Sequence, residues 1–167
     1  MNVSSALVRR VVGIADMQVS ANPADLLITY ALGSCLGITI YDSIAGVGGL
    51  LHVMLPESNI DAQKARENPL MFVDLGVPLL FRRAYALGAK KERIVAKVAG
   101  GATTGPSDGE DRFQIGKRNF VKLRELFWKN GVMLSGHEVG GHASRTLSLN
   151  VGTGEVMLKA DGLEIAL

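Results

Sequence analysis

The chain has 167 residues, which is enough for a domain with a hydrophobic core, and we expect a single domain over residues 1–167. Apolar residues make up 47% and charged residues 20% of the sequence, proportions that are typical of globular proteins and exclude a disordered chain. A net charge of +2 and an aromatic content of 5% give no general reason to bind nucleic acid.

The start of the chain and its apolar segments predict neither secretion nor membrane insertion. In "MNVSSALVRRVV" the arginines follow the first apolar residues, and a continuous apolar region is lacking, unlike in a signal peptide. The longest apolar stretch, residues 70–81, is shorter than the roughly 20 residues that a membrane span needs. The one cysteine, Cys35, cannot form an internal disulfide and suits a reducing compartment. We therefore expect a cytoplasmic protein.

Three short apolar segments in the first third of the chain predict buried strands. They cover residues 26–31, 36–42 and 48–56, and each is rich in leucine or β-branched residues and bounded by glycine. The turn between the first two carries the sequence "GSC", so Cys35 is expected at a bend and not inside a strand.

Two helices are expected in the middle of the chain. Residues 69–87 have apolar side chains at helical spacing, and Gly88 stands where a helix commonly ends; Pro78 inside this segment predicts a kink or a break. The second helix is expected from near Asn119 to Gly131. Further strands are expected in "RIVAKVAGGA", "GVMLSGHEV", "RTLSLNV", "VMLK" and "LEIAL". Strands at both ends around two main helices predict an α+β fold with mixed, largely antiparallel sheets.

Three motifs that suggest a metal or nucleotide site are incomplete. In "HEVGGH", His137 and His142 do not have the four-residue spacing of a zinc-binding helix, and two glycines between them would break that helix. "GGATTGPS" has Pro106 where a phosphate-binding loop has lysine, and "GVGGLL" ends in leucine where a dinucleotide motif has glycine. Neither a metal nor a nucleotide is expected.

Cys35 and His52 are the strongest candidates for a reactive site. Strand alternation places His52 on one face with Leu50 and Met54, so the imidazole is expected to be partly desolvated. Taken singly, each residue is more typical of a packed interior. Their two segments are joined by one loop, however, and could be neighbours in one sheet. In that arrangement the histidine would lower the pKa of the thiol and make it a nucleophile. Thr29, on the strand before the bend, could orient the imidazole.

Several segments together resemble one known family. "TYALGSCLGITIYD", "GGLLHVMLP", "KVAGGA", "IGKRNF" and "GGHASRTLSLNVGTGEV" are similar, in content and order, to the chemoreceptor glutamine deamidase (CheD) family of bacterial chemotaxis. The resemblance implies a fold related to the catalytic domains of deamidating toxins and a papain-like triad of cysteine, histidine and threonine. By their positions in these motifs, the triad residues are Cys35, His52 and Thr29.

The resemblance also implies a reaction. Cys35 would attack the side-chain carboxamide of a receptor glutamine, and hydrolysis of the thioester would leave glutamate, with no metal or organic cofactor. Backbone N–H groups of Ser34 and Cys35 are expected to hold the oxyanion, with Gly33 permitting a sharp backbone course. The partners would be cytoplasmic chemoreceptor helices and, in some family members, a CheC-type chemotaxis phosphatase.

Three alternatives remain open from the sequence: a regulatory role as a binding partner of that phosphatase, methylesterase activity, and cysteine protease activity. A basic group is formed by Arg82, Arg83, Lys90, Lys91 and Arg93. It could contact acidic receptor helices, although charge runs of this kind are more often a solvent-exposed face. The chain departs from the family pattern at Tyr30-Ala31, where a glycine or small residue is frequent, and at Glu138, where aspartate is common.

Overall fold

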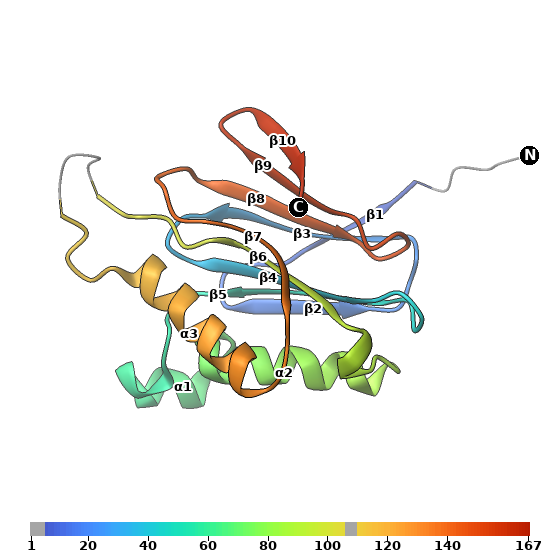
Figure 1. The fold of residues 1–167 in the computed structure, drawn as a ribbon, viewed down its shortest axis with the longest axis horizontal. Helices are drawn as coiled ribbons and strands as arrows, with labels where there is room; N and C mark the ends of the chain where they lie inside the picture. The colour runs from blue at the N-terminus through green and yellow to red at the C-terminus, as the bar shows by residue number, and fades with distance from the viewer. Residues whose placement is uncertain (1–5, 106–109) are drawn as a thin grey trace, which may run out of the picture.

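Two stacked β-sheets with helices against one of them make up the computed structural model, which describes residues 6–105 and 110–167 (Figure 1). In this part of the chain the strand orders are β1-β3-β8-β9-β10 and β2-β5-β4-β6-β7. The first sheet consists of β1 (Val8–Val11), β3 (Asp25–Leu32), β8 (Arg145–Asn150), β9 (Val156–Ala160) and β10 (Leu163–Ala166). The second consists of β2 (Asp16–Ser20), β5 (Val47–Val53), β4 (Leu36–Asp42), β6 (Val95–Gly100) and β7 (Leu134–Val139). The pairs β1–β3 and β6–β7 are parallel and the other pairs are antiparallel.

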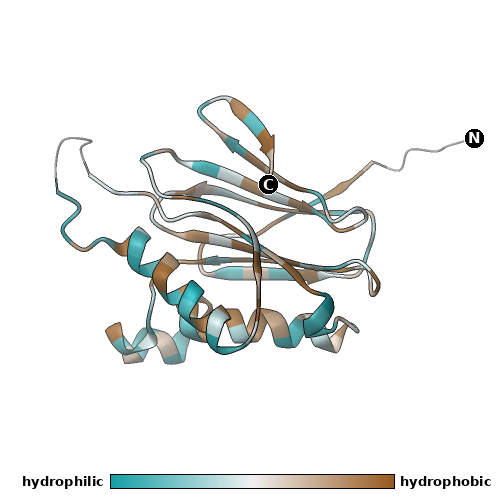
Figure 2. Cartoon of the chain, in the orientation of Figure 1, coloured by the Kyte–Doolittle hydropathy of each residue, from teal (hydrophilic) through white to brown (hydrophobic). Residues whose placement is uncertain are grey.

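The helices lie together on the outer side of the second sheet (Figure 1). They are α1 (Ala62–Glu67), α2 (Val73–Ala86) and α3 (Ile115–Lys129), with short 3-10 turns at Ser58–Ile60, Pro69–Met71 and Lys91–Arg93. Hydrophilic and hydrophobic residues alternate along α3, as expected of a helix with one buried face (Figure 2). This arrangement confirms the predicted fold class. Over the described residues, no helix has both the length and the apolar character that crossing a bilayer requires.

Two layers of apolar side chains hold the sheets and helices together. One lies between the helices and the second sheet and includes Leu51, Phe81 and Leu123. The other lies between the two sheets and includes Leu50 and Leu147. Side chains alternate along a strand, so β5 contributes to both layers, and every residue of β5 is buried. The residues of β5 that share the face of Leu50, His52 among them, therefore point into the layer between the sheets.

The predicted helix over residues 69–87 is present with two differences. Its first turn is a separate 3-10 turn, and α2 starts only at Val73. Pro78 does not split the helix, because the residues around it stay packed on the second sheet. The helix ends at Ala86, and Gly88, the predicted capping residue, has a φ of 103° and forms a Schellman motif.

The start of α3 was predicted at Asn119 and lies instead at Ile115. Gly116, in the first turn, disfavours a helix by its intrinsic propensity. A side chain at this position would collide with the backbone carbonyls of Gly101 and Ala102. Close contact with this loop therefore requires glycine there, and the contact outweighs the local propensity.

Most predicted strands are confirmed. Residues 26–31 and 36–42 belong to β3 and β4, and the later five predicted strands appear as β6 to β10. The strand predicted over 48–56 ends at Val53, because the next two N–H groups donate to the carbonyl of Met71. β1 and β2 were missed, since β1 is exposed throughout and β2 buries only Met17.

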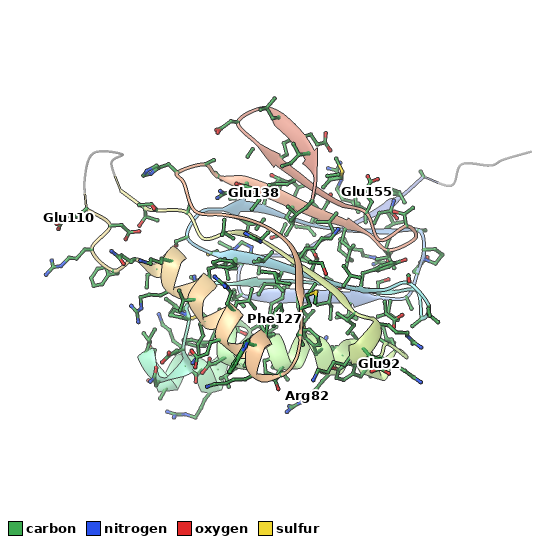
Figure 3. The ribbon with its side chains drawn as sticks, viewed as in Figure 1. Arg82, Glu92, Glu110, Phe127, Glu138 and Glu155 are labelled. Atoms are coloured by element: carbon green, nitrogen blue, oxygen red, sulfur yellow. The ribbon has the colours of Figure 1, made fainter. Side chains whose placement is uncertain are left out.

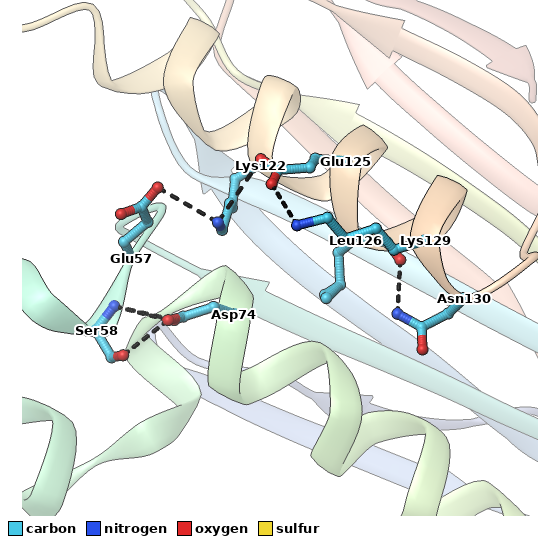
Figure 4. A network of polar contacts seen from close by, with 8 residues as sticks. All are labelled: Glu57, Ser58, Asp74, Lys122, Glu125, Leu126, Lys129 and Asn130. Atoms are coloured by element: carbon cyan, nitrogen blue, oxygen red, sulfur yellow. Dashed lines mark hydrogen bonds and ion pairs between the residues drawn. The ribbon is translucent and has the colours of Figure 1, made fainter.

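A polar network fixes α3 and α2 near the end of β5 (Figure 4). The Nζ of Lys122 lies 3.4 Å from Glu57 Oε1 and 3.7 Å from Glu125 Oε2. The N–H and hydroxyl of Ser58 donate to the carboxylate of Asp74, the hydroxyl at 2.7 Å. These contacts join the segment that follows β5 to both main helices.

Candidate active site

A bulge at the end of β3 directs the chain toward Cys35. The pairing of β3 with β8 shifts register between Thr29 and Leu32, and both of these side chains are buried while the two residues between them are exposed. One of the two, Ala31, has a φ of 57°, in the left-handed region. The extra residue bends the strand, and the chain then crosses from the first sheet to the second through residues 33–35.

The backbone bends at residues 33–35, and the left-handed backbone conformation that precedes this bend lies at Ala31 and not at Gly33. Gly33 is not among the residues with positive φ, and a Cβ built on it would meet no atom within 4 Å. The departure from the family pattern at Tyr30-Ala31 thus falls on a backbone position where glycine is ordinarily favoured. The space around Gly33 is open beside the cysteine.

Cys35 and His52 come from neighbouring strands of the second sheet. Cys35 immediately precedes β4, and the β4–β5 ladder pairs Gly37 with His52. Because strand residues two apart share a face, Cys35 and His52 occupy diagonal positions, for which typical separations are about 7–8 Å between Cα atoms. Cys35 packs against the layer between the sheets, the same layer into which His52 points. The structure therefore brings the two predicted residues to one face of the second sheet, where the paired strands β4 and β5 end.

Thr29 reaches His52 from the opposite sheet. Its Oγ1 lies 2.8 Å from His52 Nδ1 and 2.7 Å from the carbonyl oxygen of Val12. A carbonyl can only accept, so the threonine hydroxyl hydrogen goes to Val12 and its oxygen accepts from Nδ1–H. This assignment leaves the lone pair of the neutral imidazole on Nε2, which is buried and has no hydrogen-bond partner among the described residues. The imidazole thus presents a basic nitrogen that the fold itself does not use.

Burial favours the neutral forms of both Cys35 and His52. Desolvation raises the pKa of the Cys35 thiol above its ordinary value of 9.0, and the residue's own backbone N–H opposes this shift. Desolvation lowers the pKa of His52 below 6.5. A thiol beside an unprotonated imidazole is the arrangement in which histidine can act as a general base.

The bend that carries Cys35 is held through its carbonyl groups. The oxygens of Gly33 and Cys35 accept from the N–H groups of Ala102, at 2.8 Å, and Gly101, at 2.9 Å. Gly100 has a φ of 112°, and a Cβ there would collide with the Cys35 carbonyl. Gly100 of "KVAGGA" is therefore required by close contact with the bend, whereas a Cβ on Gly101 would meet the carbonyl of Gly116 in α3. Since these contacts use carbonyls, the N–H groups of Ser34 and Cys35 remain the candidate oxyanion donors.

Two buried polar residues near the bend were missed as functional candidates. Asn119 is completely buried and donates to the carbonyls of Ser34 and Met54. Arg145 is 4% exposed; it forms an ion pair with Glu138 at 2.6 Å and donates to backbone oxygens that include Gly100 O. Both residues lie in segments that carried the family resemblance, but only their burial reveals what they contact.

Of the rejected motifs, "GGATTGPS" contributes its first three residues to the contacts with the bend, whereas His137 of "HEVGGH" and two arginines of the basic group make other contacts. The His137 ring centroid is 5.7 Å from that of Phe120, and within the described residues no three His, Cys, Asp or Glu side chains gather as metal ligands. Arg93 bonds to Asp42 and is structural. Arg82 lies on the outer side of the helical layer, on the opposite face of the second sheet from Cys35 (Figure 3). Arg82 and Arg93 therefore do not contribute to the candidate site.

Comparison with known proteins assigns the family. Residues 54–160 match the family model described as "CheD chemotactic sensory transduction". The chain is 47% identical over 152 residues to "Probable chemoreceptor glutamine deamidase CheD 1" of Syntrophus aciditrophicus, covering 91% of this chain and 94% of that protein. It is also 47% identical to "Probable chemoreceptor glutamine deamidase CheD" of Solibacter usitatus, covering 91% and 89%.

A solved structure offers only a weak likeness. A Neisseria meningitidis protein of the DUF152 family superposes with a TM-score of 0.46 at 11% identity, covering 81% of this chain and 63% of that one. No inference about function follows from a likeness at that level. The relatives, at much higher identity, decide the family: the chain belongs to the CheD family of chemotaxis proteins.

Proposed function

We propose that this protein hydrolyses glutamine side chains on chemoreceptors to glutamate, with Cys35 as nucleophile, His52 as general base and acid, and Thr29 as the residue that orients the imidazole. The names of the relatives give the substrate class, a glutamine on a chemoreceptor. The observation that carries the assignment of residues is the bond from His52 Nδ1–H to Thr29, which leaves a buried, unused Nε2 on the face that Cys35 shares.

The reaction follows from these groups. The thiol proton passes to Nε2 as sulfur bonds to the carboxamide carbon, and the N–H groups of Cys35 and Ser34 hold the oxyanion. The imidazolium returns the proton to the nitrogen, the carbon–nitrogen bond breaks, and ammonia leaves a thioester. His52 then takes a proton from water, and hydroxide attack releases glutamate and the Cys35 thiol.

The assay combines the purified protein with a receptor cytoplasmic fragment. The expected result is release of ammonia together with conversion of particular glutamines to glutamate, read by peptide mass spectrometry, and loss of both with Cys35→Ala. Methanol release from a methylated fragment would instead indicate esterase activity, and chain cleavage a protease. If Cys35→Ala restored chemotaxis fully in cells that lack the protein, a binding role, such as one toward a CheC-type phosphatase, would replace the catalytic proposal.

A further inference from the structure

Asn119 joins the backbone beside Cys35 to the backbone beside His52. Its side chain is completely buried, and its Nδ2 donates to Ser34 O at 3.0 Å and to Met54 O at 3.0 Å. Ser34 directly precedes the cysteine, and Met54 is two residues beyond the histidine. A single amide group therefore contacts both segments that carry the candidate reacting side chains.

This amide stands where the β4–β5 ladder ends. The last pair of that ladder is Leu36 with Val53, so Ser34 and Met54 lie just beyond it on the two backbones. Further ladder hydrogen bonds would hold the two backbones at a fixed separation. Here the Asn119 amide has that role, because it bridges the bend and the residues that follow β5.

The two acceptors determine the orientation of the amide. Both contacts are to carbonyl oxygens, so the nitrogen must face them and Oδ1 must point away. Oδ1 is buried and lacks a hydrogen-bond partner within the part of the chain that the structure describes. An unpaired buried acceptor is unfavourable, and departures of this kind are expected where function imposes a requirement.

The first turn of α3 lies against the loop that holds the bend. A Cβ on Gly116, one turn before Asn119, would collide with the carbonyls of Gly101 and Ala102, whose N–H groups donate to the carbonyls of the bend. One turn after Asn119, Lys122 pairs with Glu57, in the segment that follows β5. Asn119 thus occupies a helix position that is fixed relative to both segments.

We propose that Asn119 is a positioning residue that sets the separation between the Cys35 thiol and the His52 imidazole. It contacts neither reacting side chain directly and acts through the backbone at Ser34 and Met54. This role rests on the proposed function, in which thiol and imidazole exchange a proton. A displacement of about 1 Å at such a pair can lower a rate by about 100-fold.

The test compares Asn119→Ala and Asn119→Ser with Leu123→Ala. Leu123 is also completely buried, one turn further along α3, but packs in the layer between the helices and the second sheet. For each folded variant the measurements are kcat and KM for deamidation, the pH midpoint of Cys35 alkylation by iodoacetamide, and the denaturant midpoint of unfolding.

Asn119→Ala is expected to lower kcat by about 100-fold with little change in KM, and to shift the alkylation midpoint. Asn119→Ser keeps one donor and should fall between Asn119→Ala and wild type; it decides the question if Asn119→Ala does not fold. Leu123→Ala should lower the denaturant midpoint while kcat and the alkylation midpoint stay near wild type. Wild-type kcat in the Asn119 variants, or equal losses in Leu123→Ala, would overturn the positioning role.

The alkylation measurement separates this proposal from the proposed function. It needs no receptor substrate, so it reports on the thiol even if the wild-type protein deamidates nothing. Absence of deamidation by wild type would reject the proposed function. An unchanged alkylation midpoint in both Asn119 variants would reject the role of Asn119.

Discussion

The hydroxyl of Thr29 and the imidazole of His52 meet at 2.8 Å although they belong to different sheets. Thr29 is anchored in turn by its bond to the Val12 carbonyl, so its oxygen is a fixed acceptor for Nδ1–H. The contact between the two sheets therefore also determines which imidazole nitrogen carries the proton. A shift of one sheet relative to the other would change the position and the protonation of Nε2.

Replacing Thr29 by valine is therefore expected to impair the proposed chemistry more than the fold. Valine has a similar shape but offers Nδ1–H no acceptor, so the favoured tautomer and ring orientation are lost. We expect kcat to fall by about 100-fold, the scale of a general acid–base contribution. Thr29→Ser, which retains the hydroxyl, should recover most of the activity. A Thr29→Val enzyme with wild-type kcat would show that His52 needs no orienting partner.

The pH dependence should reflect a neutral thiol–imidazole pair. Burial raises the pKa of Cys35 above 9.0 and lowers the pKa of His52 below 6.5, so neither group is charged at neutral pH in the free enzyme. The acid limb of kcat/KM, which reports protonation of the imidazole, should consequently lie below pH 6.5. Thiolate absorbance should appear only above pH 9.0. A strong thiolate signal at neutral pH, absent in Cys35→Ser, would instead indicate a preformed ion pair.

The sequence was sufficient to predict the strands around Cys35 and the candidate pair itself. Residues 36–42 form an apolar run bounded by turn residues, and that local pattern coincides with β4. The pairing of neighbouring strands β4 and β5 then follows from one short connection. Strand periodicity also gave the face on which His52 points.

Contacts between distant segments could not be predicted in this way. Asn119 bonds to carbonyls 85 and 65 residues away, and backbone carbonyls carry no sequence signal. The residue therefore appeared only as the start of a helix, while the true start at Ile115 depends on Gly116 fitting against another loop. The left-handed conformation at Ala31 could not be predicted either, because alanine, unlike glycine, does not favour a positive φ.

Stability at low pH should depend on Asp42. Its completely buried carboxylate loses solvation, which raises its pKa, but N–H groups of Ala45, Lys90 and Ile44 and the Arg93 guanidinium together lower the pKa to about 2. Because the folded pKa lies below the ordinary value of 3.8, the stabilisation is fully present above that value and is lost as pH falls toward 2.

The shift corresponds to about 2 kcal/mol of unfolding free energy. Urea unfolding of wild type and Asp42→Asn should thus differ at pH 7 and converge as the pH approaches 2. Asp61→Asn offers a matched control, since Asp61 is partly exposed and caps only the short α1. A pH-independent difference between wild type and Asp42→Asn would contradict the assignment of the stabilisation to the charged carboxylate.

Gly33 lies in the bend and Gly100 contacts it from the end of β6, but substitution by alanine should affect stability differently at the two positions. A Cβ at Gly100 would strike the Cys35 carbonyl, and its φ of 112° is strained for any L side chain, whereas a Cβ at Gly33 meets open space. Gly100→Ala should lower the unfolding free energy by about 1–3 kcal/mol and change the rate of Cys35 alkylation, since the bend must move. Gly33→Ala should leave the unfolding free energy within about 0.5 kcal/mol of wild type. An equal decrease in unfolding free energy in the two variants would contradict this prediction. It would mean that both positions need glycine for its backbone freedom, and that the contact between Gly100 and the Cys35 carbonyl has no particular effect.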